Sequence, residues 1–189
     1  MTSTTELLGP VRAATWFDRG RDWIDADPAR RRVLGWLAPT LVTLLAAVLR
    51  LVNLGHPDAL VFDETYYVKD SWSQWNLGYP SGWAGDDVDG RFAEGYTAAW
   101  TGVGSFAVHP PLGRWLIGAG MALFGASSSF GWRIAVALCG IASVLVLYLL
   151  AKTLTRSAAF ASLAGFLLAI DGLAIVLSRV ALLDGILTL

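Results

Sequence analysis

Long uninterrupted apolar runs constrain this sequence more than any other feature. The first, Val33 to Val52, has about the 20 residues that a helix needs to cross a hydrocarbon core roughly 30 Å thick. Two later runs, 134–151 and 158–177, are also long enough to span. Because 55% of the 189 residues are hydrophobic and gather in runs instead of alternating, we expect an all-α, multi-spanning membrane protein.

The rest of the composition agrees with a membrane protein and excludes two other classes. Nine tryptophans and five tyrosines lie mostly between the runs, where side chains that prefer the lipid–water interface are found. The basic residues are scattered, so the sequence does not predict a nucleic-acid binder. The single Cys139 lies within an apolar run and cannot form a disulfide framework.

The first 32 residues are predicted to be a solvated, partly helical cytoplasmic tail. They lack the short apolar core and small-residue cleavage site of a signal peptide. Arg30, Arg31 and Arg32 directly precede the first span, so the positive-inside rule places the N-terminus in the cytoplasm. Residues 33–189 then form the transmembrane domain of a protein that we expect in the plasma membrane.

The charges after the second full span decide the rest of the topology. Lys152 and Arg156 lie in a short turn and should also be cytoplasmic, so an even number of crossings precedes them. Spans 33–52 and 134–151 supply two. The shorter apolar segment 112–125, interrupted by Arg114, should therefore lie along the membrane surface.

Residues 53–133 are accordingly predicted to form one long extracytoplasmic loop with its own helices. Within it, the Gly- and Asp-rich stretch 82–95 is expected to be a flexible loop. The segment after Leu177 returns to the same outer face. Candidate polar residues from three parts of the chain therefore share one side of the membrane.

Two adjacent carboxylates, Asp63 and Glu64, follow the first span. Neighbouring residues point in different directions, so one can face a reaction centre while the other bonds a structural partner. An aspartate beside an acceptor hydroxyl can remove its proton as a general base. Alternatively, Asp63 is the N-cap of a helix that begins at this point.

Two arginines, Arg50 and Arg133, lie at the outer ends of the first two spans. Each can extend to the headgroups with its stem in lipid. Each can also bind phosphate, because the planar guanidinium makes bidentate contacts with phosphate oxygens. The sequence alone leaves both interpretations open, although two arginines on one face favour an anionic lipid substrate.

Further candidates lie in the last third of the chain and in the loop. Asp171 lies inside an apolar span, where an ionisable group usually marks function or a buried pair. An ion pair between Asp171 and Arg179 would explain Asp171 and would leave Asp184 free to join the outer site. Arg179 and Asp184 are both candidate substrate-binding residues on the outer face. His109, before Pro110, either caps a turn or positions substrate. Several carboxylates could hold a divalent cation, but two acids do not require one, and no metal site is predicted.

In this order, these residues resemble the protein O-mannosyltransferase family of GT-C type membrane glycosyltransferases. The resemblance covers nearly the whole chain after residue 33. It is carried by Arg50-Leu51, Phe62-Asp63-Glu64-Thr65-Tyr66-Tyr67, His109-Pro110-Pro111-Leu112-Gly113, Arg133, and Ser178-Arg179 with Leu182-Leu183-Asp184. The family implies a multi-spanning helical bundle whose first outer loop carries interfacial helices.

The resemblance also implies a reaction and roles for these residues. Mannose would pass from membrane-embedded polyprenyl-phosphate-mannose to a Ser or Thr hydroxyl of a secreted protein, with inversion, on the extracytoplasmic face. Asp63 would be the base, Glu64 would shape the site or contact the acceptor, and Asp184 would lie nearby. Arg50 and Arg133 match positions that support the site. A phosphate leaving group needs cationic stabilisation and no general acid, so no cofactor is implied.

Three other functions compete with this one. A related transferase would move a sugar from a lipid phosphate to a glycolipid, and a non-catalytic module would bind only lipid or a partner. A transporter is disfavoured because the acids gather at one surface and not at the bilayer midplane. Family members continue through further spans, and a last apolar run, 186–189, stops at the final residue. We therefore expect an N-terminal portion that is inactive alone.

Overall fold

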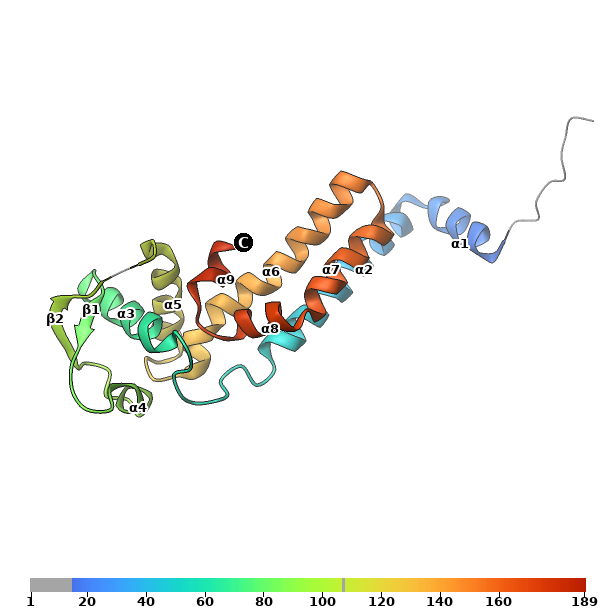
Figure 1. Ribbon diagram of the computed structural model, residues 1–189. Coiled ribbons are helices and arrows are strands. Elements are labelled where there is room, and N and C mark those ends of the chain that lie inside the picture. The colour runs from blue at the N-terminus through green and yellow to red at the C-terminus, as the bar shows by residue number, and fades with distance from the viewer. Residues whose placement is uncertain (1–14, 107) are drawn as a thin grey trace, which may run out of the picture. The chain divides into compact units, whose positions relative to one another are not determined.

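The computed structural model describes residues 15–106 and 108–189 and divides into two compact units, residues 1–38 and 39–189. It is mainly helical, which confirms the predicted fold class (Figure 1). The described elements are α1 (Trp16–Asp25), α2 (Pro28–Leu51), α3 (Glu64–Leu77), β1 (Ser81–Trp83), α4 (Val88–Ala93), β2 (Trp100–Gly104), α5 (Pro111–Phe124), α6 (Ser129–Thr155), α7 (Ala158–Ile170), α8 (Gly172–Arg179) and α9 (Leu183–Leu187).

The first unit contains α1 and the beginning of α2. Of the predicted tail, residues 1–14 lie outside the described residues. Helix α2 begins at Pro28, where a proline is favoured because its missing N–H needs no partner. Arg30 lies in its first turn and stacks 3.7 Å over the ring of Trp23. The arginines that were expected to precede the first span are therefore helical themselves.

Two helices, α2 and α6, are long and apolar enough to cross a membrane. Their exposed side chains include Leu41, Leu44, Leu138 and Val146. In water such exposure would be costly, but lipid solvates these side chains well. The structure contains no membrane, so orientation across one remains a prediction.

The third apolar run is bent, which the sequence analysis did not predict. Helices α7 and α8 meet at an angle of 57° and would make a third crossing if they span together. Asp171 lies at the break, where its Oδ1 accepts a hydrogen bond of 2.7 Å from the backbone N–H of Ala174. This side chain caps α8 and replaces a bond that the broken helix has lost.

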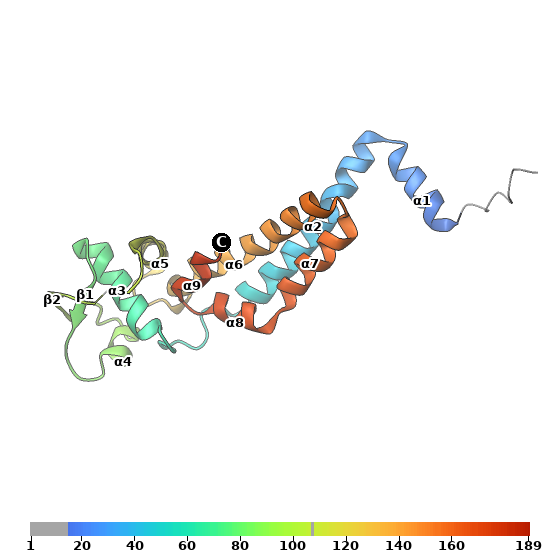
Figure 2. The same ribbon diagram turned by 45° about the horizontal axis from the view of Figure 1, so that its top comes forward.

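The predicted outer loop folds into α3, a two-stranded sheet, α4 and α5, grouped around the beginning of α6 (Figures 1 and 2). Strands β1 and β2 pair antiparallel, with Ser81 opposite Gly104 and Trp83 opposite Trp100. The expectation of a flexible loop at 82–95 was wrong in part, because this stretch contains the end of β1 and all of α4.

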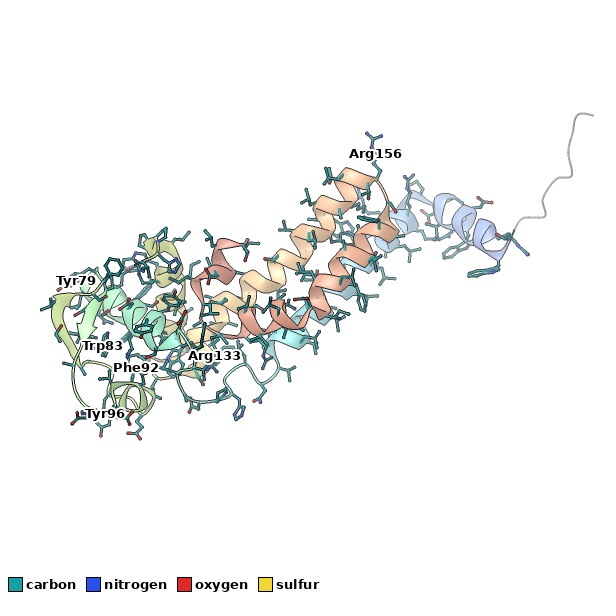
Figure 3. The ribbon with its side chains drawn as sticks, in the orientation of Figure 1. Tyr79, Trp83, Phe92, Tyr96, Arg133 and Arg156 are labelled. Carbon is teal, nitrogen blue, oxygen red and sulfur yellow. The ribbon has the colours of Figure 1, made fainter. Side chains whose placement is uncertain are left out.

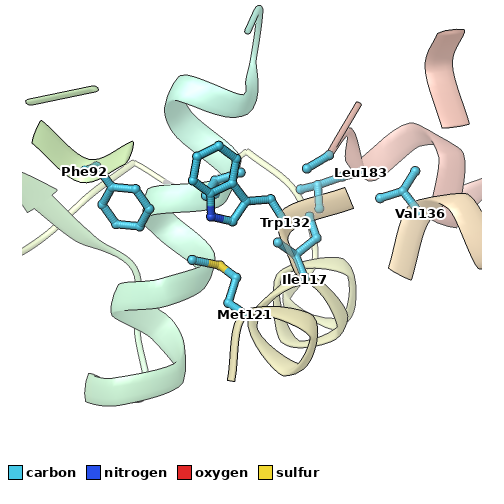
Figure 4. Close-up of a cluster of buried hydrophobic side chains, with 8 residues drawn as sticks. Phe92, Ile117, Met121, Trp132, Val136 and Leu183 are labelled. Atoms are coloured by element: carbon cyan, nitrogen blue, oxygen red, sulfur yellow. The ribbon is translucent and has the colours of Figure 1, made fainter. Parts of the chain in front are cut away.

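An aromatic and aliphatic core holds the loop elements on α6. Trp132 is fully buried between the loop and the last segment of the chain, beside Phe92, Met121, Ile117 and Leu183 (Figure 4). Its indole Nε1 donates to the carbonyl of Ala126 at 2.7 Å, which satisfies its polar atom. This core places the loop and the start of α9 around one end of α6.

Close packing of α5 on α6 depends on a glycine pair. A Cβ atom built on Gly120 would lie 2.4 Å from the backbone oxygen of Gly131, far inside van der Waals contact. No side chain therefore fits at Gly120 without moving one of the helices. Helix α5 also packs on α3, where a Cβ atom on Gly118 would lie 3.1 Å from the backbone oxygen of Ser71, and Arg114 of α5 lines a pocket with Tyr67 of α3.

Candidate active site

The carboxylate of Asp63 stands at the start of α3 and lines a pocket of about 440 Å³. The backbone carbonyl of Asp63 accepts bonds of 3.0 Å from the amides of Tyr66 and Tyr67. Its side chain makes no capping bond. The alternative role as a side-chain N-cap is therefore not observed, and in the described part of the chain no donor bonds this carboxylate.

The neighbouring Glu64 has the opposite environment. It is fully buried, and its two oxygens lie 2.8 Å from Nε and Nη2 of Arg133. The same carboxylate accepts backbone N–H bonds from Val61 at 3.1 Å and from Ala181 at 2.8 Å. Glu64 thus joins the loop, α6 and the segment before α9.

The guanidinium of Arg133 is saturated with acceptors. Besides Glu64, it donates to the backbone carbonyls of Leu54, Pro57 and Ala59 at 3.2, 2.9 and 3.0 Å. An arginine has five N–H donors, and all five are used here. Figure 3 labels Arg133 where α6 meets the loop. In this arrangement, Arg133 has no N–H left for a phosphate oxygen.

Arg50 occupies a buried position between helices. Its Nη1 and Nη2 donate to the carbonyls of Ala169 and Leu168 at 3.1 and 3.3 Å, in the last turn of α7. A cation is favourable there because the helix C-terminus carries partial negative charge. Arg50 lines a second, largely apolar pocket of about 420 Å³ that also includes Ser178 and Asp184. It does not line the pocket that contains Asp63.

Arg179 caps another helix in the same way. Its guanidinium donates to the carbonyls at the end of α2 and just after it, with N–O distances of 2.9 to 3.3 Å: Leu49, Arg50, Val52 and Asn53. The suggested ion pair between Asp171 and Arg179 was wrong, since each of these residues caps a helix instead.

Tyr67 lines the Asp63 pocket, and His109 contacts Tyr67 without lining the pocket itself. The hydroxyl of Tyr67 lies 3.1 Å from Nε2 of His109, and the two rings pack edge to face. Burial raises the pKa of Tyr67, and the charges of Asp63 and then Asp184 raise it further. The hydroxyl of Tyr67 therefore contacts His109 and experiences the charges of both Asp63 and Asp184, although Asp184 lines the pocket of Arg50 and not that of Asp63.

Asp70 and Ser105 complete the polar lining of this pocket. The Ser105 hydroxyl donates to Oδ1 of Asp70 at 3.1 Å. Burial raises the pKa of Asp70, while the Ser105 hydrogen bond and the charges of Arg114 and Lys69 oppose that rise. A carboxylate and a hydroxyl at such a position are suited to bonding the hydroxyl groups of a sugar or an acceptor.

The sequence analysis missed Arg114, treating it only as an interruption of a short apolar run. It is buried, lines the Asp63 pocket and donates to the side chain of Gln74 and the carbonyl of His109. A cation inside an otherwise apolar 14-residue segment was the available signal. Among the described residues, no cluster of three or more His, Cys, Asp or Glu side chains could hold a metal ion.

Comparison with known proteins identifies the family. A family model described as dolichyl-phosphate-mannose-protein mannosyltransferase matches residues 108–189. Polyprenol-phosphate-mannose–protein mannosyltransferase from Mycobacterium tuberculosis is 38% identical over 160 residues, which are 83% of this chain. The chain belongs to the protein mannosyltransferase family. The sequence resemblance is thereby confirmed.

Two other mannosyltransferase relatives with the same name come from Mycolicibacterium smegmatis and Corynebacterium glutamicum. They are 35% and 30% identical over 81% and 76% of this chain. The chain spans about a quarter of the length of these relatives: 27% in the mycobacterial proteins and 26% in the corynebacterial one. No solved structure matches it.

Proposed function

We propose that this chain contributes the acceptor-activating part of a membrane mannosyltransferase. The donor would be polyprenyl-phosphate-mannose and the acceptor a Ser or Thr hydroxyl of a secreted protein. The names of the related mannosyltransferases support this donor and a protein acceptor. The predicted topology places the reaction on the extracytoplasmic face.

One observation carries the proposal: two adjacent acids have separate environments. Glu64 is buried and bonded to Arg133 and two backbone amides. Asp63 lines an open pocket, and no donor bonds its carboxylate within the described ranges. A general base must be able to reach the substrate hydroxyl, and of these two acids Asp63 meets this requirement.

The proposed reaction is a single displacement. The acceptor oxygen attacks the anomeric carbon while Asp63 takes the hydroxyl proton. The bond between the anomeric carbon and the phosphate oxygen breaks, and its electron pair leaves on the phosphate. One displacement inverts the anomeric configuration, as in other base-assisted sugar transfers.

The remaining site residues serve this reaction by position. Glu64 and Arg133 hold the start of α3, so they fix the direction in which Asp63 points. Tyr67 lines the pocket of the base and is held by His109, and the charge of Asp184 acts on Tyr67. Arg50 and Arg179 bond the ends of α7 and α2, so they hold these helices in place.

The test is mannose transfer from radiolabelled donor to a Ser- and Thr-rich peptide. Membranes would contain this chain, or a chimera in which it replaces the matching segment of the Mycolicibacterium smegmatis relative. In the chimera, we expect Asp63→Asn to lower transfer by about 10²–10⁴-fold, the usual contribution of a general base. Membrane insertion should be unchanged.

Asp58→Asn is the matched control, because Asp58 is an exposed acid in the same loop. It should leave transfer intact. Undiminished transfer by the Asp63→Asn chimera would remove Asp63 from the role of base. Transfer to glycolipid but not to peptide would favour the glycolipid alternative, and a product with the donor's configuration would exclude inversion.

A further inference from the structure

Arg114 is held rigidly in the wall of the Asp63 pocket. Its side chain is only 4% exposed, its Nε donates to Oε1 of Gln74 at 2.9 Å, and its Nη2 donates to the carbonyl of His109 at 2.9 Å. Gln74 is also buried and is anchored through Nε2 to the carbonyl of Pro111 at 3.2 Å. The direction of the guanidinium is therefore set before any ligand arrives.

This guanidinium keeps unused donors, unlike that of Arg133. Two of its five N–H groups have acceptors, and the other three have none among the residues that the structure describes. No described carboxylate lies within ion-pair distance of Arg114, although Asp63 and Asp70 line the same pocket. A fixed cation with free donors in a pocket is suited to bind an anion.

The anion follows from the reaction. Resting on the mannosyl transfer proposed above, we propose that Arg114 binds the phosphate of the polyprenyl-phosphate donor. As the sugar–phosphate bond breaks, negative charge grows on the phosphate, and a preorganised guanidinium stabilises it. Arg114 on α5 and Asp63 at the start of α3 would then act on the leaving group and the acceptor, respectively.

The pocket has a suitable size for this arrangement. Its volume of about 440 Å³ lies within the range of roughly 300–1,000 Å³ that small-molecule sites usually have. Exposed apolar side chains at its rim, Phe106 and Val108, could contact the first part of the lipid chain. Arg114 thus takes the phosphate-binding role that the sequence analysis also offered for Arg133, whose five donors are all bonded.

The test measures binding of a short-chain polyprenyl phosphate to the whole chain in lipid nanodiscs. Because charge-assisted bonds to phosphate are strong, we expect Arg114→Gln to weaken binding by about tenfold or more. Arg114→Lys should recover part of the loss, since it keeps the charge but not the fork. The unphosphorylated polyprenol should bind the two proteins equally.

A phosphorus NMR titration distinguishes a direct contact between Arg114 and the phosphate from a purely structural role of Arg114. A nearby guanidinium lowers the pKa of the bound phosphate, so this pKa should rise in Arg114→Gln. Arg91→Gln is the control, because Arg91 is exposed on α4 and does not line the pocket. If Arg114→Gln is poorly folded, Arg114→Lys tests the assignment through affinity alone, because it keeps the charge but loses the bidentate geometry and should bind more weakly than the wild type.

Wild-type affinity in Arg114→Gln, equal phosphate pKa values, or no binding by the wild-type chain would each overturn this assignment. The proposed function fails separately. Arg114-dependent binding without mannose transfer by the chimera would retain the phosphate site and reject the enzyme activity. Mannose transfer that does not depend on Arg114 would retain the enzyme activity and reject the phosphate site.

Discussion

The outer loop and the membrane-spanning helices neutralise their buried charges in different ways. In the loop, the buried Glu64 meets the buried Arg133, so a negative group is paired with a positive one. In the spans, Arg50 and Arg179 donate to backbone carbonyls at the ends of other helices. The same residue type therefore completes a charge pair in one region and a helix terminus in the other.

The difference follows from the polar groups that each region leaves without a hydrogen-bond partner. The last carbonyls of a helix have no partner within it, and the hydrocarbon core offers no water to bond them. An arginine satisfies several such carbonyls and the helix dipole together. In the loop core, a desolvated carboxylate is the costlier group, and a cation with matching geometry compensates it. Asp63 takes part neither in the ion pair of the loop nor in the bonding of a helix end by an arginine.

Removing one partner of the loop pair should have the largest effect. Glu64→Gln leaves the buried charge of Arg133 uncompensated, which typically costs about 3–5 kcal/mol. We expect the loop to unfold at a lower temperature, as followed by tryptophan fluorescence and limited proteolysis. Glu94→Gln, an exposed change in the same loop, should have little effect.

The double variant Glu64→Gln with Arg133→Met should be less harmed than Glu64→Gln alone, because it removes the uncompensated charge. An unchanged unfolding temperature for Glu64→Gln would mean that the pair of Glu64 and Arg133 does not hold the loop. The proposed difference between the loop and the spans would then be wrong.

Removing a helix-end cation in the spans should cost less. Arg179→Met deletes bonds to four carbonyls at and just after the end of α2. Because this side chain is only partly buried, we expect a total loss of about 1.5–3 kcal/mol, the contribution of a single hydrogen bond to a charged group. Hydrogen exchange should become faster around Val52. Lys152→Met, an exposed cation elsewhere, should not change it. Exchange that stays slow would show that this end needs no cation.

The cap at the bent span should have a smaller effect. Asp171→Ala removes the bond to the Ala174 amide, and losing an N-cap typically costs about 1 kcal/mol. Exchange of the Ala174 amide should become faster, while Asp171→Ser should largely preserve its protection. If Ala and Ser variants exchange alike, the bend does not depend on this cap.

The smallest effect concerns pH. Because burial raises the pKa of Asp70, the folded loop binds more protons than the unfolded chain between the ordinary and the raised pKa. Stability therefore falls as the pH rises through this window and is fully present below it. Asp70→Asn should flatten the dependence of the loop's unfolding temperature. A dependence that survives this change would belong to another group.

The spans and the acidic motif were predictable from local features. A run such as Val33 to Val52 is long enough to span whatever it packs against, because lipid solvates it. The 57° bend was not predictable from hydropathy, since Asp171 interrupts a run without changing its average much. The loop hairpin was missed because β1 has only three residues.

In the candidate site, too, the sequence predicted which residues take part but not the environment of each one. Asp63 and Glu64 were both found, but nothing in their adjacency tells which one is buried. Arg133 and Arg114 look alike as cations among apolar neighbours, yet one has every donor bonded and the other does not. These differences depend on contacts between residues far apart in the sequence.

The sequence by itself determined the membrane class, the family motifs and the acids and cations from which a site could be built. Only the tertiary structure decided which of them are used up as structural partners and which remain available. Hydropathy is a property of the local chain, whereas the availability of a charged group depends on every donor and acceptor that folding brings to it.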